Sequence, residues 1–459
     1  MNEGEQNKYI EDIDYLVNYL ITTHPDIYRN ISKEELQEKI DQIKSTPQNM
    51  ISFELSIRKL LAKINDSHTT IIDDNEINSP FKFRFLQDKL YIIEDAVNQS
   101  NEFIYNEITK INGIPLPFII EELKKYVSYN NESDLKRQLT TTLTNVSFLQ
   151  KILKKKSLIF ESRKNNTSKI FDLTEESTKE HRKTSTLLNY NYIDNDTLYI
   201  KYGTCDTHLA DVESFVNDIN DTIKMKQPKK LIFDLRDNQG GNSSYLKSLL
   251  ETFQPITVKT TLVNENVFSS AGLNMQDMRN IGSLIVGQPI ALNTNHFGNS
   301  LKTTLPNTKI DIHCSSNEFI LYNNEIKRIT KEEPQKENVK VTVYNKEYTL
   351  PKSFLTKKEN FKIDIPLNLT IEDYKKIKDP ELVIATAITN KVYKDLMDNQ
   401  NQIPITKNND LEENKTRKLT PQYSNENSSG KINIFNLLII VLIICIIGVI
   451  IAYILFKLK

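Results

Sequence analysis

Apolar side chains recur at helical spacing over the first sixty residues of the chain. The pattern is clear in residues 9–22, and it continues in residues 32–43, where Ser32 and Glu35 form a capping pair. A third apolar-periodic segment covers residues 53–64. We therefore predict an N-terminal helical bundle, which we place at residues 1–72.

Short alternating runs replace the helical pattern after residue 80. Residues 83–93 and 106–116 alternate apolar with polar side chains, and the second run contains the turn sequence Asn112-Gly113. This pattern predicts a small β-rich insert at residues 80–130.

Helical spacing returns in residues 133–155, a segment that is rich in lysine. We interpret these lysines as a solvated face rather than a binding patch, because no aromatic side chains are interleaved with them.

The middle of the chain alternates strand and helix patterns. A strand, a helix and a second strand are predicted at residues 196–203, 209–225 and 231–235, which is the βαβ unit of an α/β core. Two further helix and strand pairs follow up to residue 290, and a closing helix is predicted at residues 380–397. We place the α/β core at residues 131–397.

The C-terminal part has a different composition. Residues 398–431 are polar and charged, as in a flexible linker. An uninterrupted apolar run then begins at Leu437 and ends at Phe456, and its 20 residues match the thickness of a bilayer core. We predict a single-pass membrane anchor at residues 432–457. Because the N-terminus lacks the pattern of a secretory signal, we expect the preceding domain to be cytoplasmic.

Composition narrows the possible functions. The chain has 59 basic and 60 acidic residues, so its net charge of -1 gives no reason to expect a nucleic-acid partner. Three cysteines lie far apart, which suggests neither a disulfide framework nor a metal cluster. We expect no metal and no cofactor, and the oligomeric state is not readable from the sequence.

Two stretches carry the candidate chemistry. The first, LIFDLRDNQGGN, ends a buried strand in Gly240 and Gly241, whose backbone N–H groups precede a helix N-terminus and can bind an anion. The second, VFSSAG, places Ser270 at a helix start. Far upstream, His68 lies in the turn NDSHTTI. A serine nucleophile needs a base and oxyanion donors, although a helix cap and a hydrogen-bonded turn histidine are the ordinary structural alternatives.

Five segments in order resemble the tail-specific, or C-terminal processing, serine peptidases. The resemblance is to the branch that includes the tricorn core and the interphotoreceptor retinoid-binding proteins, and it covers residues 9–395. The segments are LLAKINDSHTTI, EITKINGIPL, LIFDLRDNQGGNS, VFSSAGLNMQDMRNIGSLIVGQPI and IDIPLNLTIEDYKKIKDPELVIATAI.

This resemblance implies a crotonase-like α/β core, a degenerate PDZ-like insert and a serine-type endopeptidase that cleaves protein or peptide substrates. It gives Ser270 the position of the nucleophile, with Ser269 as the fallback, and His68 that of the general base. The family's oxyanion hole corresponds to Gly240, Gly241 and the N–H of Ala271.

The resemblance also implies supporting residues for the base. Ser67 occupies the position of a serine that supports the histidine in tricorn-like members. Glu359 is nearest to the place expected for the family's acid, but its spacing departs from the pattern. A lysine base is disfavoured, since the first lysine after Ser270 is Lys302. His296 either lines the site or is a hydrogen-bonded loop residue.

Two other functions stay open at this point. The chain can be a catalytically inactive binding protein on the same fold. It can also be a membrane-tethered scaffold whose helical bundle binds a partner.

Overall fold

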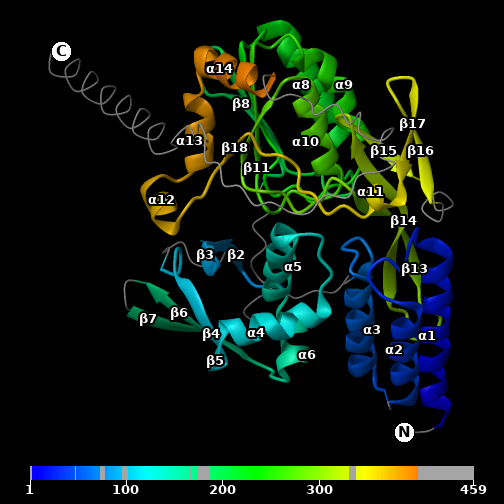
Figure 1. Ribbon diagram of the computed structural model, residues 1–459. Coiled ribbons are helices and arrows are strands. Elements are labelled where there is room, and N and C mark those ends of the chain that lie inside the picture. Colours follow the sequence, from blue (N-terminus) through cyan, green and yellow to red (C-terminus); the bar gives the residue numbers. More distant parts are fainter. Residues whose placement is uncertain are drawn as a thin grey trace, which may run out of the picture. The chain divides into compact units, whose positions relative to one another are not determined.

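The computed structural model describes residues 3–46, 48–72, 78–95, 102–164, 167–173, 186–329 and 337–401. The chain forms two compact units, Met1–Ala385 and Thr386–Lys459. In the second unit the structure describes helix α14 (Asn390–Asn401). The sheets and the candidate site belong to the first unit, and Figure 1 labels most of the strands.

The N-terminal segment is helical, as its periodicity predicts. It forms α1 (Glu3–Thr23), α2 (Lys33–Ser45) and α3 (Met50–Ile64). The predicted cap of α2 is present, since the Ser32 side chain accepts a hydrogen bond from the Glu35 N–H. The apolar faces of these helices share a core with buried residues of the hairpin β13 (His296–Thr304) and β14 (Asp311–Tyr322), among them Ile312 and Cys314.

An antiparallel sheet follows the helices, in the order β2-β3-β4-β6-β7 with β5 beside β4. Its strands are β2 (Phe81–Leu86), β3 (Lys89–Asp95), β4 (Glu107–Ile111), β5 (Ile114–Pro115), β6 (Leu158–Lys164) and β7 (Thr167–Leu173). Buried residues of this sheet share a core with those of α4 (Leu116–Leu123), α5 (Glu132–Thr144) and α6 (Val146–Leu153). The sheet thus takes strands from both sides of the boundary predicted at residue 130.

The central sheet confirms the predicted α/β core. Its order is β18-β12-β11-β10-β9-β8, and all neighbours are parallel except β8 and β9. The strands are β8 (Leu188–Tyr192), β9 (Thr197–Tyr202), β10 (Lys230–Asp234), β11 (Val258–Val263), β12 (Leu284–Gly287) and β18 (Ile365–Pro366). The connecting helices are α8 (Val212–Lys226), α9 (Ser244–Phe253) and α10 (Ser270–Asn280). β11 and β12 are buried throughout, as is typical of strands covered on both faces.

Additional strands join the helical N-terminal part to the rest of the unit. β1 (Thr70–Ile72) pairs with β14, which also pairs with β13 and with β15 (Glu325–Ile329). β16 (Asn338–Val343) and β17 (Lys346–Pro351) form a separate hairpin. The remaining elements are the 3-10 helix η1 (Lys124–Tyr126), α11 (Lys352–Leu355), α12 (Ile371–Lys376) and α13 (Pro380–Ala387).

The anchor predicted at residues 432–457 lies outside the described residues, as does the predicted linker from residue 402 on. Among the helices that the structure describes, none is both long enough and apolar enough to cross a bilayer.

Gly287 provides a test of the central sheet. It ends β12 with φ +138°, and a Cβ atom there would lie 1.9 Å from the carbonyl oxygen of Val263 on β11. We expect Gly287→Ala to lower the free energy of unfolding by about 3 kcal/mol, because backbone strain and a backbone clash add together. Urea unfolding measures this loss.

Gly113→Ala is the matched control. Gly113 also has a positive φ, +76°, but no heavy atom beyond its two chain neighbours lies within 4 Å of the place that a Cβ atom would take there. Only the backbone strain remains, so we expect a loss of about 1 kcal/mol. Equal losses in the two variants would contradict the close packing of β12 on β11.

Candidate active site

The predicted base lies in a turn organised by a buried carboxylate. The turn joins α3 to β1, and within it the backbone N–H of His68 donates to Oδ1 of Asp66 at 3.1 Å. Oδ2 of Asp66 accepts hydrogen bonds from the hydroxyls of Thr69 and Ser315, both at 2.6 Å. Nε2 of His24 lies 3.3 Å from the same oxygen. Asp66 therefore joins the turn to β14 and to the segment after α1.

Asp66 remains ionised at neutral pH. Burial alone would raise the pKa of its carboxyl, but the hydrogen bond and charge of His24, together with the hydrogen bond from Ser315, hold the pKa well below its usual range. A fully buried carboxylate is stable only with such partners. We conclude that Asp66 holds the backbone of the turn, since it bonds to the His68 N–H and not to the imidazole.

The imidazole of His68 is buried, and both of its ring nitrogens lack a hydrogen-bond partner among the described residues. The ring stacks on Phe268 with centroids 4.3 Å apart and an angle of 24° between the planes. Burial lowers the pKa of His68, while the charges of Asp66 and Asp134 partly oppose this shift. The ring is thus neutral near pH 7, which is the form that can accept a proton.

Phe268 connects the base to a fixed cation on α5. The guanidinium of Arg137 lies 3.9 Å from the centroid of the Phe268 ring. Arg137 is held by two hydrogen bonds to Oδ1 of Asp134, at 2.7 and 3.0 Å, and by one to the side chain of Gln239 at 3.0 Å. Arg137, Phe268 and His68 therefore form a continuous chain of contacts, with Phe268 in the middle.

Ser270 begins α10, two residues after Phe268. Ser269, directly before it, has a positive φ of 52°, an uncommon conformation for a residue with a side chain. The hydroxyl of Ser270 donates to the carbonyl oxygen of Gly241 at 2.7 Å. The turn that carries Ser270 therefore contacts the His68 ring through Phe268. The Ser270 hydroxyl itself bonds to the glycine loop.

The glycine loop packs closely against the nucleophile turn. A Cβ atom on Gly240 would lie 2.8 Å from Cβ of Ser269 and 3.1 Å from the nitrogen of Ser270. A Cβ atom on Gly241 would lie 2.3 Å from the carbonyl group of Cys205. Both positions therefore require glycine, which is a second reason for the paired glycines besides anion binding.

The three predicted oxyanion donors differ in whether their N–H groups already form a hydrogen bond. The N–H of Gly240 donates to the side chain of Asn238 at 2.8 Å, and the N–H of Ala271 donates to the carbonyl of Phe268 at 3.1 Å. The N–H of Gly241 has no partner within the described part of the chain. Gly241 is accordingly the donor that is available in this arrangement.

The two predicted supporting residues lie apart from the imidazole nitrogens. The Ser67 hydroxyl accepts a hydrogen bond from the side-chain amide of Asn130. Glu359 is exposed, and it is its backbone carbonyl that accepts a bond, from the N–H of Thr294 at 2.8 Å. The carboxylates whose charge acts on His68 are Asp66 and Asp134, and neither was predicted as a site residue.

His296 lies near the base and is also hydrogen-bonded. Its ring centroid is 6.3 Å from that of His68 and 5.3 Å from that of Phe319. Its Nδ1 donates to the carbonyl of Asn293 at 2.9 Å. Burial, with a smaller effect from the charge of His68, lowers the pKa of His296 to about 3.

Within the described ranges no cluster of three or more His, Cys, Asp or Glu side chains could hold a metal ion.

Comparisons with known proteins identify the fold. No family model matches the chain, and no curated protein sequence does. Mature CPAF matches with a TM-score of 0.58 over 87% of this chain and 99% of its own, at 11% identity. The chain has the fold of CPAF.

A second CPAF structure, a complex with lactacystin, matches over 86% of this chain and 99% of its own, with a TM-score of 0.58 and 11% identity. The photosystem II D1 C-terminal processing protease matches with a TM-score of only 0.43, at 10% identity over 79% of this chain and 93% of its own. We draw no argument from that weaker likeness. The CPAF match agrees with the mixed α/β fold that the sequence resemblance implies.

Two buried histidines with lowered pKa values, His68 and His296, predict how stability depends on pH. The pKa of each histidine is lower in the folded chain than the ordinary value of about 6.5 that it has in the unfolded chain. Below about pH 6.5 the unfolded chain therefore binds more protons than the folded chain. The stability is therefore present above that pH and is lost as the pH falls. Between pH 7.5 and 5.5 we expect His296, with its pKa of about 3, to cost about 1.4 kcal/mol of unfolding free energy, and His68 to add a cost of the same sign.

Urea unfolding of His296→Asn at both pH values tests this expectation. The variant should lose the part that His296 contributes, about 1.4 kcal/mol of the change in unfolding free energy between the two pH values. His208→Asn is the control, because His208 is exposed. A pH dependence that is the same in wild type and His296→Asn would contradict the buried neutral state of His296.

Proposed function

We propose that the chain is a serine-type peptidase in which Ser270 is the nucleophile and His68 the general base. The observation that most supports this proposal is the 4.3 Å stacking of Phe268 on His68, because Phe268 belongs to the same turn as Ser270. The CPAF fold supports it independently. The finer description of the fold, a crotonase-like core with a degenerate PDZ-like insert, is also part of the proposal.

The chemistry begins with rotation of the Ser270 hydroxyl away from the Gly241 carbonyl. Its oxygen attacks the carbonyl carbon of a peptide bond while its proton passes to a ring nitrogen of His68. The tetrahedral intermediate carries a negative oxygen, which the Gly241 N–H stabilises. Two further N–H groups contribute once they leave their present acceptors for the substrate oxygen. That of Gly240 leaves the Asn238 side chain, and that of Ala271 leaves the Phe268 carbonyl.

The intermediate collapses when His68 returns the proton to the leaving amine, and an acyl-enzyme on Ser270 remains. Water, deprotonated by His68, then releases the acid product and restores the serine. The negative charges of Asp66 and Asp134 favour the transient imidazolium. Ser67, adjacent to His68 in the turn, supports its position. We assign no step to Glu359, whose carboxylate is exposed.

A specific observation favours a second candidate, a catalytically inactive binding protein on the same fold. The ring nitrogens of His68 lack partners within the described residues, and the Ser270 hydroxyl bonds to the Gly241 carbonyl instead. A binding protein would keep this arrangement permanently, whereas a peptidase leaves it when substrate binds.

Degradation of an unfolded protein such as reduced casein distinguishes the two candidates. We expect Ser270→Ala and His68→Ala each to lower kcat/KM at least a thousandfold, because nucleophile and base act as one unit. Ser269→Gly should keep most of the activity, since glycine accepts the positive φ at that position. Activity that survives in Ser270→Ala, or none in wild type, would contradict the peptidase assignment.

We also propose that residues 437–456 anchor the chain in a membrane, with the domain before them in the cytoplasm. The support comes from the sequence alone, in the 20 consecutive apolar residues.

In cells, we expect the full chain to stay in the membrane fraction after an alkaline carbonate wash and a chain that ends at residue 431 to be released. Release of both chains would refute the anchor. Protease removal of the domain from intact cells would refute its cytoplasmic placement.

A further inference from the structure

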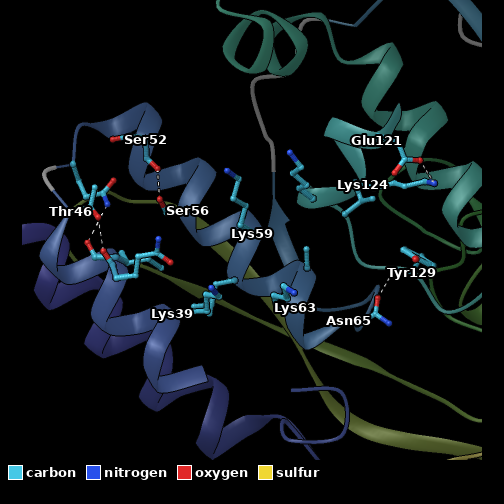
Figure 2. A pocket seen from close by; sticks show the side chains of 17 residues that line it. Lys39, Thr46, Ser52, Ser56, Lys59, Lys63, Asn65, Glu121, Lys124 and Tyr129 are labelled. Carbon is cyan, nitrogen blue, oxygen red and sulfur yellow. Dashed lines mark hydrogen bonds and ion pairs between the residues drawn. The ribbon is translucent and has the colours of Figure 1, made fainter. Parts of the chain in front are cut away.

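A large hollow lies away from the candidate active site, between two N-terminal helices and η1. It has a volume of about 800 Å³, within the range of ligand-binding clefts. Figure 2 shows side chains from α2 and α3 on one side and Lys124 with Tyr129 on the other. Five lysines line it, and we call it the lysine groove: Lys39, Lys59, Lys63, Lys124 and Lys125.

The positive charge of the lysine groove is only partly neutralised. Glu121 is the one carboxylate among its lining residues, and it pairs with Lys124 at 2.6 Å. Lys63 pairs with Glu35 at a distance of 3.6 Å. Lys125 pairs with Glu122 at 2.6 Å. Lys39 and Lys59 form no ion pair with any residue that the structure describes, so the groove retains an excess of positive charge.

The rest of the lining suits a polypeptide. Leu60 and Val127 contribute apolar atoms to the lining, and the Thr46 hydroxyl, which donates to the Gln42 carbonyl at 2.8 Å, can still accept a hydrogen bond from a backbone N–H. Lys59 also lies 5.0 Å from the ring centroid of Tyr126. A ligand that carries carboxylates together with apolar groups and backbone amides matches this mixture. A flat bilayer surface does not, because the lysines line a recess.

One end of the lysine groove reaches the turn of the predicted base. Asn65 and Tyr129 both line the groove, and the Asn65 side chain accepts a hydrogen bond from the Tyr129 N–H at 3.1 Å. Asn65 lies three residues before His68, and Asn130, next to Tyr129, bonds to Ser67. Figure 2 shows the contact between Asn65 and Tyr129. A chain bound in the groove would therefore lead toward the residues beside His68.

We propose that the lysine groove is an exosite that binds an acidic stretch of a polypeptide substrate. The bound polypeptide is a substrate only if the proposed peptidase function is correct, so the proposal rests on that function. The binding itself does not need catalysis. The groove raises the local concentration of chains that carry an acidic segment near the scissile bond. The attraction between the lysines and an acidic segment is electrostatic, and the groove is open to solvent. Binding should therefore weaken as the salt concentration increases.

The binding test uses the full chain with Ser270→Ala, so that no peptide is cleaved. The probe is a fluorescein-labelled twelve-residue peptide of alternating Glu and Leu, measured by fluorescence anisotropy in low salt. We expect Lys39→Gln/Lys59→Gln to weaken binding at least fivefold and the same peptide with Gln in place of Glu to bind at least tenfold more weakly.

Lys155→Gln/Lys156→Gln is the matched control, since it removes the same charge from two exposed lysines outside the groove. We expect it to change the affinity less than twofold. Equal losses in the two double variants would overturn the proposal, as would groove-dependent binding to phosphatidylserine vesicles with no binding of the acidic peptide. Thermal unfolding of each variant shows that it is folded.

A cleavage assay separates this proposal from the proposed function. In the otherwise wild-type chain, Lys39→Gln/Lys59→Gln should raise KM for an acidic substrate at least fivefold and leave kcat, and the cleavage of a neutral substrate, unchanged. Failure of the peptidase assignment would remove all cleavage but not the groove-dependent binding. Intact cleavage with no groove dependence would overturn the exosite alone.

Discussion

The buried carboxylate of Asp66 is the constraint on which the candidate site depends. It accepts hydrogen bonds from the hydroxyls of Thr69 and Ser315 and from the backbone of His68, and it contacts His24. These partners come from separate parts of the chain, so one fully buried charge holds the end of α3, the segment after α1 and strand β14 together. A buried charge without such partners would cost several kcal/mol, so the loss of one partner would destabilise the contacts of Asp66 with all three segments.

The other half of the site depends on close backbone packing. The parallel order of β10, β11 and β12 brings the glycine loop and the start of α10 to the same edge of the sheet. Gly240 lets the loop approach Ser269 to a distance that no Cβ atom would permit. Phe268 then links the two halves, since it stacks on His68 and carries the guanidinium of Arg137 on its ring.

The local parts of this arrangement were predictable from the sequence, and the long-range parts were not. The helices before His68, the strand before the glycine loop and the helix at Ser270 follow from apolar periodicity and turn residues. The contact of Asp66 with Ser315 joins positions 249 residues apart, and that of Arg137 with Phe268 is also distant in sequence. No periodicity encodes such contacts. For the same reason the family resemblance led only to Glu359 as the residue nearest the expected acid, with a spacing that departs from the pattern, and the structure places that side chain in solvent.

Mapping the adduct of a fluorophosphonate by mass spectrometry tests the central claim most directly. The account predicts one modified peptide with the phosphonate on Ser270, and a rate of modification that falls at least a hundredfold in His68→Ala. A native protein that stays unmodified, an adduct on Ser269, or a rate that does not depend on His68 would contradict it.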